Sequence, residues 1–147
     1  MDRIVARSRP LASPLHAILL AFPVALYPSA LLSDITYLNT AVIQWTNFSS
    51  WLIAGADVFA GLLLAWALFG LFFGRARHAR GRGRGLLYLL IVAAMFVAGV
   101  VNAFQHARDG WHSVGTLGLV LSIICTVLAF AAAFIAYGTV HTQEKRA

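Results

Sequence analysis

The chain has 147 residues, of which 61% are hydrophobic and only 11% are charged. So few charges cannot cover the surface of a water-soluble domain of this size, so the composition excludes that class and favours a membrane protein. The net charge of +6 suggests nucleic acid as a partner. However, ten of the eleven basic residues lie near the two termini or in one central loop, whereas a nucleic-acid-binding protein spreads them along a binding face. We therefore expect no nucleic-acid partner.

The first apolar run predicts a transmembrane helix over about residues 15–37. Ser13 can cap its free amides, and Pro14 suits the first helical position because it has no N–H to leave unpaired. Pro23 and Pro28 should bend this helix. A basic start followed by an apolar run also resembles a cleaved signal peptide. The length of the run and its prolines favour a retained span over that alternative.

Three further apolar segments predict transmembrane helices, at about residues 48–73, 86–105 and 117–138. Residues 34–50 contain one acid and no base, as expected of a translocated loop. Residues 74–85 contain five arginines, as expected of a loop that stays in the cytoplasm. We therefore expect an all-α membrane protein made of a single domain over the whole chain. Its four helices form an antiparallel bundle across a membrane, with both termini cytoplasmic.

Small residues at four-residue intervals predict where the helices approach one another. Gly70 and Gly74 form one such pair, and Gly118 and Ser122 form another. Ala94, Ala98 and Asn102 predict a stripe that runs from small to polar along the third helix. The single cysteine, Cys125, excludes an intrachain disulfide and a cysteine-based metal site, so we expect it to be a buried apolar residue.

Asp57 is an acid within the second span. An ionisable group at that depth costs about 2.5–3.5 kcal/mol on insertion scales, so it needs a partner or a purpose. The position predicts either a proton or ligand site, or a neutral acid that forms a hydrogen bond with a neighbouring helix.

A polar cluster is expected at the outer ends of the helices. Asn102, His106 and Asp109 recur at helical spacing and share one face. The cluster could bind a metal, a haem edge, a quinone headgroup or a small polar ligand, or it could simply satisfy the helix ends. The two histidines match no zinc signature, so no metal site is predicted. The proposed cluster comprises Asp34, Asp57, Asn102, His106, Asp109 and His112.

His16 and His141 are expected at the inner ends of the first and fourth helices. If these helices are neighbours, the two imidazoles could ligate a haem b iron, because bundle cores can hold such cofactors. His16 and His106 lie at opposite ends of the spans, roughly 30 Å apart, so they cannot share one iron.

Four stretches of the chain resemble the domain-of-unknown-function 2231 family of predicted bacterial membrane proteins. They are SPLHAILLAFPVALYPSALLSD, IQWTNFSSWLIAGADVFAGLL, VNAFQHARDGW and GLVLSII. The His16, Phe22, Pro23 start and the segment from Asn102 to Asp109 carry the resemblance most specifically. It implies a four-helix inner-membrane protein, and relatives can accompany redox modules. It assigns no activity and no catalytic residues.

These observations favour an accessory or structural membrane component. One alternative is a redox subunit that binds haem b or quinone near the histidines at the helix ends, and another is a small transporter component that uses Asp57. The sequence contains no nucleotide motif or nucleophile constellation, so an enzyme is disfavoured. The expected partners are the lipid bilayer and either another membrane protein or a second copy of the chain.

Overall fold

The computed structural model describes residues 5–9, 13–73, 79–108, 114–138 and 140–144. Four helices dominate these residues, and one short strand lies near each end of the chain. In chain order the elements are β1 (Val5–Arg9), α1 (Pro14–Thr40), α2 (Ile43–Phe73), α3 (Ala79–His106), α4 (Thr116–Tyr137) and β2 (Val140–Glu144).

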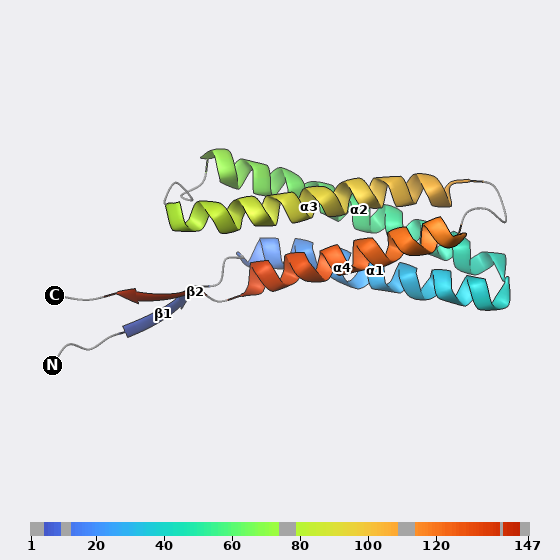
Figure 1. Cartoon of the computed structure of the whole chain (residues 1–147), viewed down its shortest axis with the longest axis horizontal. Helices are drawn as coiled ribbons and strands as arrows, with labels where there is room; N and C mark the ends of the chain where they lie inside the picture. The colour runs from blue at the N-terminus through green and yellow to red at the C-terminus, as the bar shows by residue number, and fades with distance from the viewer. Residues whose placement is uncertain (1–4, 10–12, 74–78, 109–113, 139, 145–147) are drawn as a thin grey trace.

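The helices form an antiparallel bundle, as the hydropathy pattern predicts. Each helix packs against the next one in the sequence, and α1 closes the ring by packing against α4. Figure 1 shows α2 and α3 lying together over α1 and α4. The ring arrangement encloses one interior, to which all four helices contribute side chains.

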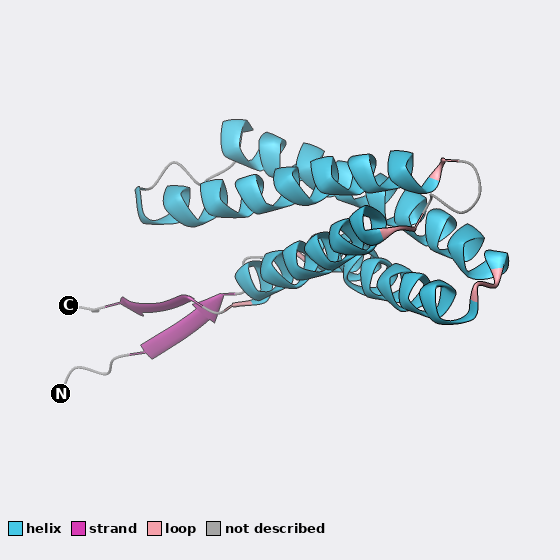
Figure 2. Cartoon of the chain, turned by 45° about the vertical axis from the view of Figure 1, so that its right-hand side comes forward, coloured by secondary structure: helices cyan, strands magenta, loops and turns pink. Residues whose placement is uncertain are grey.

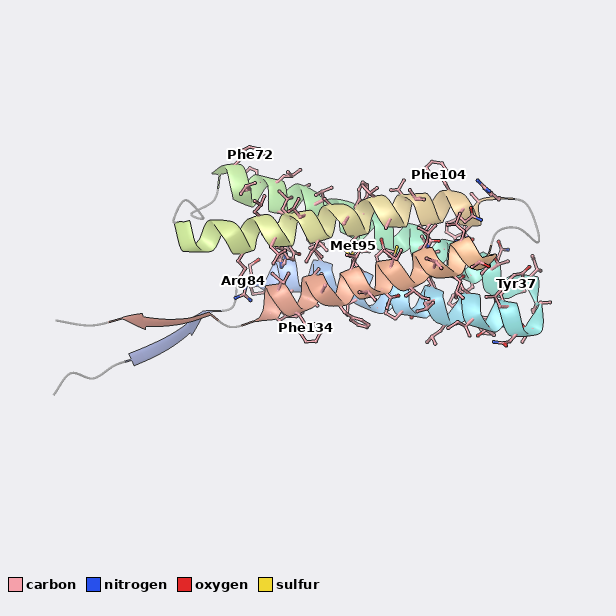
Figure 3. The ribbon with its side chains drawn as sticks, viewed as in Figure 1. Tyr37, Phe72, Arg84, Met95, Phe104 and Phe134 are labelled. Carbon is pink, nitrogen blue, oxygen red and sulfur yellow. The ribbon has the colours of Figure 1, made fainter. Side chains whose placement is uncertain are left out.

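All four helices are long and apolar enough to cross a membrane. The shortest, α4, has 22 residues and so spans roughly 33 Å at 1.5 Å per residue, which covers the hydrocarbon thickness. Large apolar side chains point away from the bundle, among them Phe134 at 81% exposure and Phe104 at 73%. Figure 3 shows both on the outside of their helices. A protein with such a surface would aggregate in water, whereas in a membrane these side chains contact the lipid tails.

Helix α1 begins as expected and ends later than expected. The Ser13 side chain accepts a hydrogen bond from the His16 amide at 3.3 Å, and the helix runs through both internal prolines to Thr40. Ala41, with φ 55°, ends the helix in the left-handed region, and its amide bonds to the Tyr37 carbonyl.

The predicted outer loop over residues 34–50 is therefore wrong. Helix α2 begins at Ile43, so only Ala41 and Val42 connect the first two helices. The polar residues of this stretch fit into helix because their side chains bond to carbonyls one turn back. Thr36 donates to Leu32 O, and Asn39 donates to Ile35 O, both at 2.8 Å. Hydroxyl and amide side chains satisfied in this way no longer favour a loop.

The arginine-rich loop is also shorter than predicted, because α3 begins at Ala79. Residues 74–78, which include His78, lie outside the described part of the chain. Arg84, near the start of α3, donates to the carbonyls of Ile135 and Gly138 at 2.8 and 3.0 Å. These carbonyls belong to the C-terminal end of α4, where unpaired acceptors and the helix dipole both favour a cation. One arginine of the expected loop thus ties α3 to α4.

The inward face of α4 consists entirely of small residues. Because no long side chain intervenes, the neighbouring helices can approach closely. Gly118 and Ser122, the predicted small pair, both belong to this face. The buried residues of α4 are Gly118, Ser122, Cys125, Thr126, Ala129, Ala132 and Ala136.

The packing stripes predicted for α2 and α3 need correction. Ala94 is exposed, and the buried stripe of α3 instead runs through Val92, Met95, Gly99, Asn102 and His106. A Cβ added at Gly70 would meet nothing within 4 Å, so this glycine does not mark a close helix contact. Its predicted partner, Gly74, lies outside the described residues.

The two terminal segments form a ribbon that the sequence did not predict. β1 pairs antiparallel with β2, in a register from Val5 opposite Glu144 to Arg9 opposite Val140. Figure 2 shows the ribbon projecting beyond one end of the bundle, so β1 and β2 both lie at that end. His141, expected at the end of the fourth helix, lies in β2 opposite Ser8. Because the two strands belong to opposite ends of the chain, no local sequence pattern indicates that they pair.

Candidate functional site

Ionisable and polar side chains lie inside the bundle at three levels. The levels are marked along α1 by His16, Tyr27 and Asp34, which are all less than 9% exposed. At 1.5 Å per residue the first two are roughly 16 Å apart and the last two roughly 10 Å. We call them the inner, middle and outer levels, with the inner level at the end that carries β1 and β2.

The outer level is a network centred on the Asp34 carboxyl. Ser49 of α2 donates to Asp34 Oδ1 at 2.5 Å, and Ser122 of α4 donates to Oδ2 at 2.5 Å. The third partner is His106 of α3, whose Nε2 lies 2.9 Å from Oδ1. Asp34, Ser49 and the His106 side chain have no exposed surface. One carboxyl therefore joins all four helices.

The hydrogen bonds of His106 fix where its ring carries a proton. Nδ1 lies 3.0 Å from the backbone carbonyl of Asn102, and a carbonyl can only accept, so Nδ1 carries a hydrogen. Nε2 faces a carboxyl oxygen onto which Ser49 also donates. Asp34 and His106 therefore form a buried hydrogen-bonded pair in which both carboxyl oxygens of Asp34 are engaged.

Asn102 extends the outer network along α3. Its side-chain Nδ2 donates to the Ser122 hydroxyl at 3.0 Å, and its backbone carbonyl accepts from His106. Asn102 Oδ1 is buried and has no partner among the described residues. Asn102 thus orients both the serine and the histidine that bind Asp34.

The middle level contains Asp57, which is 9% exposed. The Tyr27 hydroxyl donates to Asp57 Oδ1 at 2.6 Å. Since α2 begins at Ile43, Asp57 lies roughly 21 Å along its helix. This is deeper than the sequence predicted, and separate from the outer network. No ion pair to Asp57 occurs among the side chains described, so its observed partner is a phenol on a neighbouring helix.

Gly99 of α3 makes room for this pair. A Cβ at this position would overlap both Asp57 Oδ1 and the Tyr27 hydroxyl. The α3 backbone therefore packs directly against the hydrogen bond between α1 and α2, and only glycine fits there.

The inner level is an aromatic group around His16. Its Nε2 lies 2.8 Å from the Tyr88 hydroxyl, and its ring centroid is 5.3 Å from that of Tyr88 and 6.4 Å from that of Trp66. His16 Nδ1 is buried and has no partner within the described part of the chain. Leu20, Leu63 and Val92, all fully buried, belong to the apolar core that separates this level from the middle one.

A cavity adjoins each of the two histidines. The outer cavity has a volume of about 510 Å³, and its polar lining includes Thr46, Asn47, Ser50, His106 and Arg108. The His106 side chain has no exposed surface, so only the backbone of His106 can border this cavity. The inner cavity, of about 320 Å³, is bordered by His16.

The structure brings together only part of the cluster predicted from sequence. His106 contacts both Asp34 and Asn102, whereas Asp57 lies one level below and bonds to Tyr27. Asp109 and His112 lie outside the described residues. Among the residues described, no group of three or more His, Cys, Asp or Glu side chains could hold a metal ion.

The two histidines considered as haem ligands occupy different elements. His16 is buried in α1 with Nε2 engaged by Tyr88, whereas His141 belongs to β2 and its side chain is not among those described. A haem would have to displace Tyr88 from Nε2 or be ligated through Nδ1. The described residues therefore give no direct support for a shared iron.

Sequence reasoning missed the hydroxyl residues that complete the site. Ser49, Ser122, Tyr27 and Tyr88 each contact an ionisable side chain on another helix. Ser122 was expected only as a small packing residue. The available signal was weak: a buried acid in a span requires donors, and hydroxyl residues at similar depth are the candidates.

The fold and the site together define a multi-pass membrane protein with a polar network inside a four-helix bundle. The chain belongs to the family of predicted membrane proteins DUF2231, whose model matches residues 12–141. Neither a curated protein nor a solved structure matches the chain.

The close packing at Gly99 gives a direct test of the middle level. We expect Gly99→Ala to lower the free energy of unfolding by about 1–3 kcal/mol, as overpacking does, because its Cβ overlaps the pair of Tyr27 and Asp57. Gly70→Ala is the matched control: its Cβ meets nothing within 4 Å, so it should be neutral or slightly stabilising. Unfolding in mixed detergent micelles measures both. Equal stability of the two variants would contradict the described packing.

Proposed function

We propose that the protein is an accessory or structural component of the bacterial inner membrane rather than an enzyme. The observation that supports this most strongly is the outer network, in which Asp34 binds a side chain from each of the other three helices. Polar groups used in this way hold helices together, whereas catalytic groups need a face left open for substrate. The apolar outer surface adds a large area for lipid or for another membrane protein.

A transporter that uses Asp57 has less support. Asp57 is 9% exposed and bonded to Tyr27, and it lines neither of the two cavities described above. Leu20, Leu63 and Val92 are fully buried in the apolar core between the middle and inner levels. A charged substrate would have to cross this layer without polar contacts, which is costly in a low-dielectric interior.

The proposed orientation places both termini in the cytoplasm. The paired strands β1 and β2 lie at one end of the bundle, and α3 begins at that same end, with Arg80, Arg82 and Arg84 in its first turns. Ten of the eleven basic residues precede α1, follow α4 or lie within residues 74–85, and the positive-inside rule assigns segments so rich in arginine and lysine to the cytoplasm.

Cysteine labelling of intact cells tests the orientation. In a Cys125→Ala background, Val42→Cys in the exposed turn between α1 and α2 should react with an impermeant reagent, and Ala79→Cys should react only after lysis. A cysteine at Ser49, near the start of α2, would be a poor labelling position for the outer side because Ser49 is fully buried. The reverse pattern would place the termini outside.

The accessory role predicts that the purified protein carries no chromophore. Its visible spectrum, oxidised and reduced, should lack a Soret band. In mild detergent, the protein extracted from its native membrane should migrate in an assembly larger than its own 15.9 kDa plus the micelle. A Soret band that is lost in His16→Phe would overturn the proposal in favour of a haem-binding redox subunit.

A further inference from the structure

The inner cavity is built differently from the outer one. All four helices line it, at the end of the bundle that carries β1 and β2, and aromatic and small residues dominate the lining. Its volume of about 320 Å³ falls within the range of small-molecule sites, which are mostly apolar with a few placed polar groups. The residues that matter for the argument are His16, Trp66, Gly70, Arg84, Gly85 and Tyr88.

Two glycines create much of the space. A Cβ added at Gly70 of α2 or at Gly85 of α3 would meet nothing within 4 Å, although both residues line the cavity. Neither glycine is therefore required by helix packing. A larger side chain at either position would extend into open space, so the cavity can be filled by mutation without repacking the bundle.

The side chains of His16 and Tyr88 carry one more hydrogen-bond donor than their shared contact uses. A neutral His16 ring carries one hydrogen and Tyr88 carries another, but the two side chains share a single contact at 2.8 Å. If Tyr88 donates to Nε2, then the hydrogen on His16 Nδ1 is left, and that atom has no partner among the described residues. If Nε2 donates instead, the Tyr88 hydrogen is left. In either tautomer a donor remains for an acceptor atom.

The charge at the cavity points to a neutral ligand. Arg84 is the basic residue among the lining side chains, and its Nη2 already donates to the carbonyls of Ile135 and Gly138. The carbonyls at the end of α4 thus offset part of the Arg84 charge, and apart from His16 the other lining residues are not ionised at neutral pH. A neutral molecule with an oxygen acceptor suits this lining.

We propose that the inner cavity binds a lipid-soluble quinone. The ring lies among the aromatic side chains of Trp66 and Tyr88, and a carbonyl oxygen accepts the spare hydrogen of the pair formed by His16 and Tyr88. A quinone combines the features that the cavity selects: a flat ring, a neutral carbonyl acceptor and an apolar tail that remains in the bilayer. This site is separate from the outer network. It corresponds to the quinone site that the sequence allowed near the helix-end histidines, and it does not depend on the accessory role.

Titration with decylubiquinone tests the proposal. The wild-type protein in detergent micelles should bind it saturably, measured by isothermal titration calorimetry. Gly85→Leu should lower the affinity at least tenfold because its side chain fills the cavity. Gly83→Leu is the matched control: this glycine, two residues away on α3, also has an open Cβ position but does not line the cavity. Its affinity should equal that of the wild type.

A second ligand distinguishes a quinone-binding site from a cavity that binds any apolar molecule. Decylbenzene has a ring and the same alkyl chain but no oxygen, so it should bind at least tenfold more weakly than decylubiquinone. Should Gly85→Leu fail to fold, Gly70→Leu fills the cavity from α2 and carries the same expectation. The proposal is overturned if the wild type shows no saturable binding, if the cavity-filling variant binds as the wild type does, or if decylbenzene binds equally well.

Discussion

A carboxyl group buried in a low-dielectric interior is the constraint on which this bundle depends. Asp34 has no exposed surface, and a buried charge without partners would cost several kcal/mol. Its oxygens take hydrogen bonds from Ser49, Ser122 and His106, one on each of the other three helices. In lipid, apolar side chains give little preference for one helix arrangement over another, so satisfying this carboxyl selects the register in which these residues meet.

The transmembrane helices were predictable from the sequence because hydropathy acts locally, whereas the connections were not. Thr36 and Asn39 resemble loop residues, yet they extend α1 because their side chains bond within the helix. Arg84 resembles part of a solvated loop, yet it caps α4. The strand pair β1 and β2 depends on segments at opposite ends of the chain, for which no local pattern exists.

Helical spacing predicted part of the site correctly and could go no further. Asn102 and His106 share a face because they lie one turn apart, and Asp34 was the expected partner at the same end. Which helices are neighbours, and therefore that Ser49 and Ser122 complete the network, depends on tertiary packing. The same limit applies to Gly99, whose role is visible only once Tyr27 and Asp57 are placed against it.

A double-mutant cycle between Asp34 and His106 tests the central claim most directly. In unfolding experiments in mixed micelles, Asp34→Leu and His106→Leu should each cost about 3–5 kcal/mol, because each leaves a buried partner unpaired. The double variant should cost less than their sum by about 2 kcal/mol or more. A parallel cycle of Asp34 with Ser50→Ala should be additive, since the Ser50 hydroxyl donates to the Thr46 carbonyl of its own helix. Additivity within about 0.5 kcal/mol for Asp34 and His106 would contradict the account, because it would mean that the two residues do not stabilise the bundle as a pair.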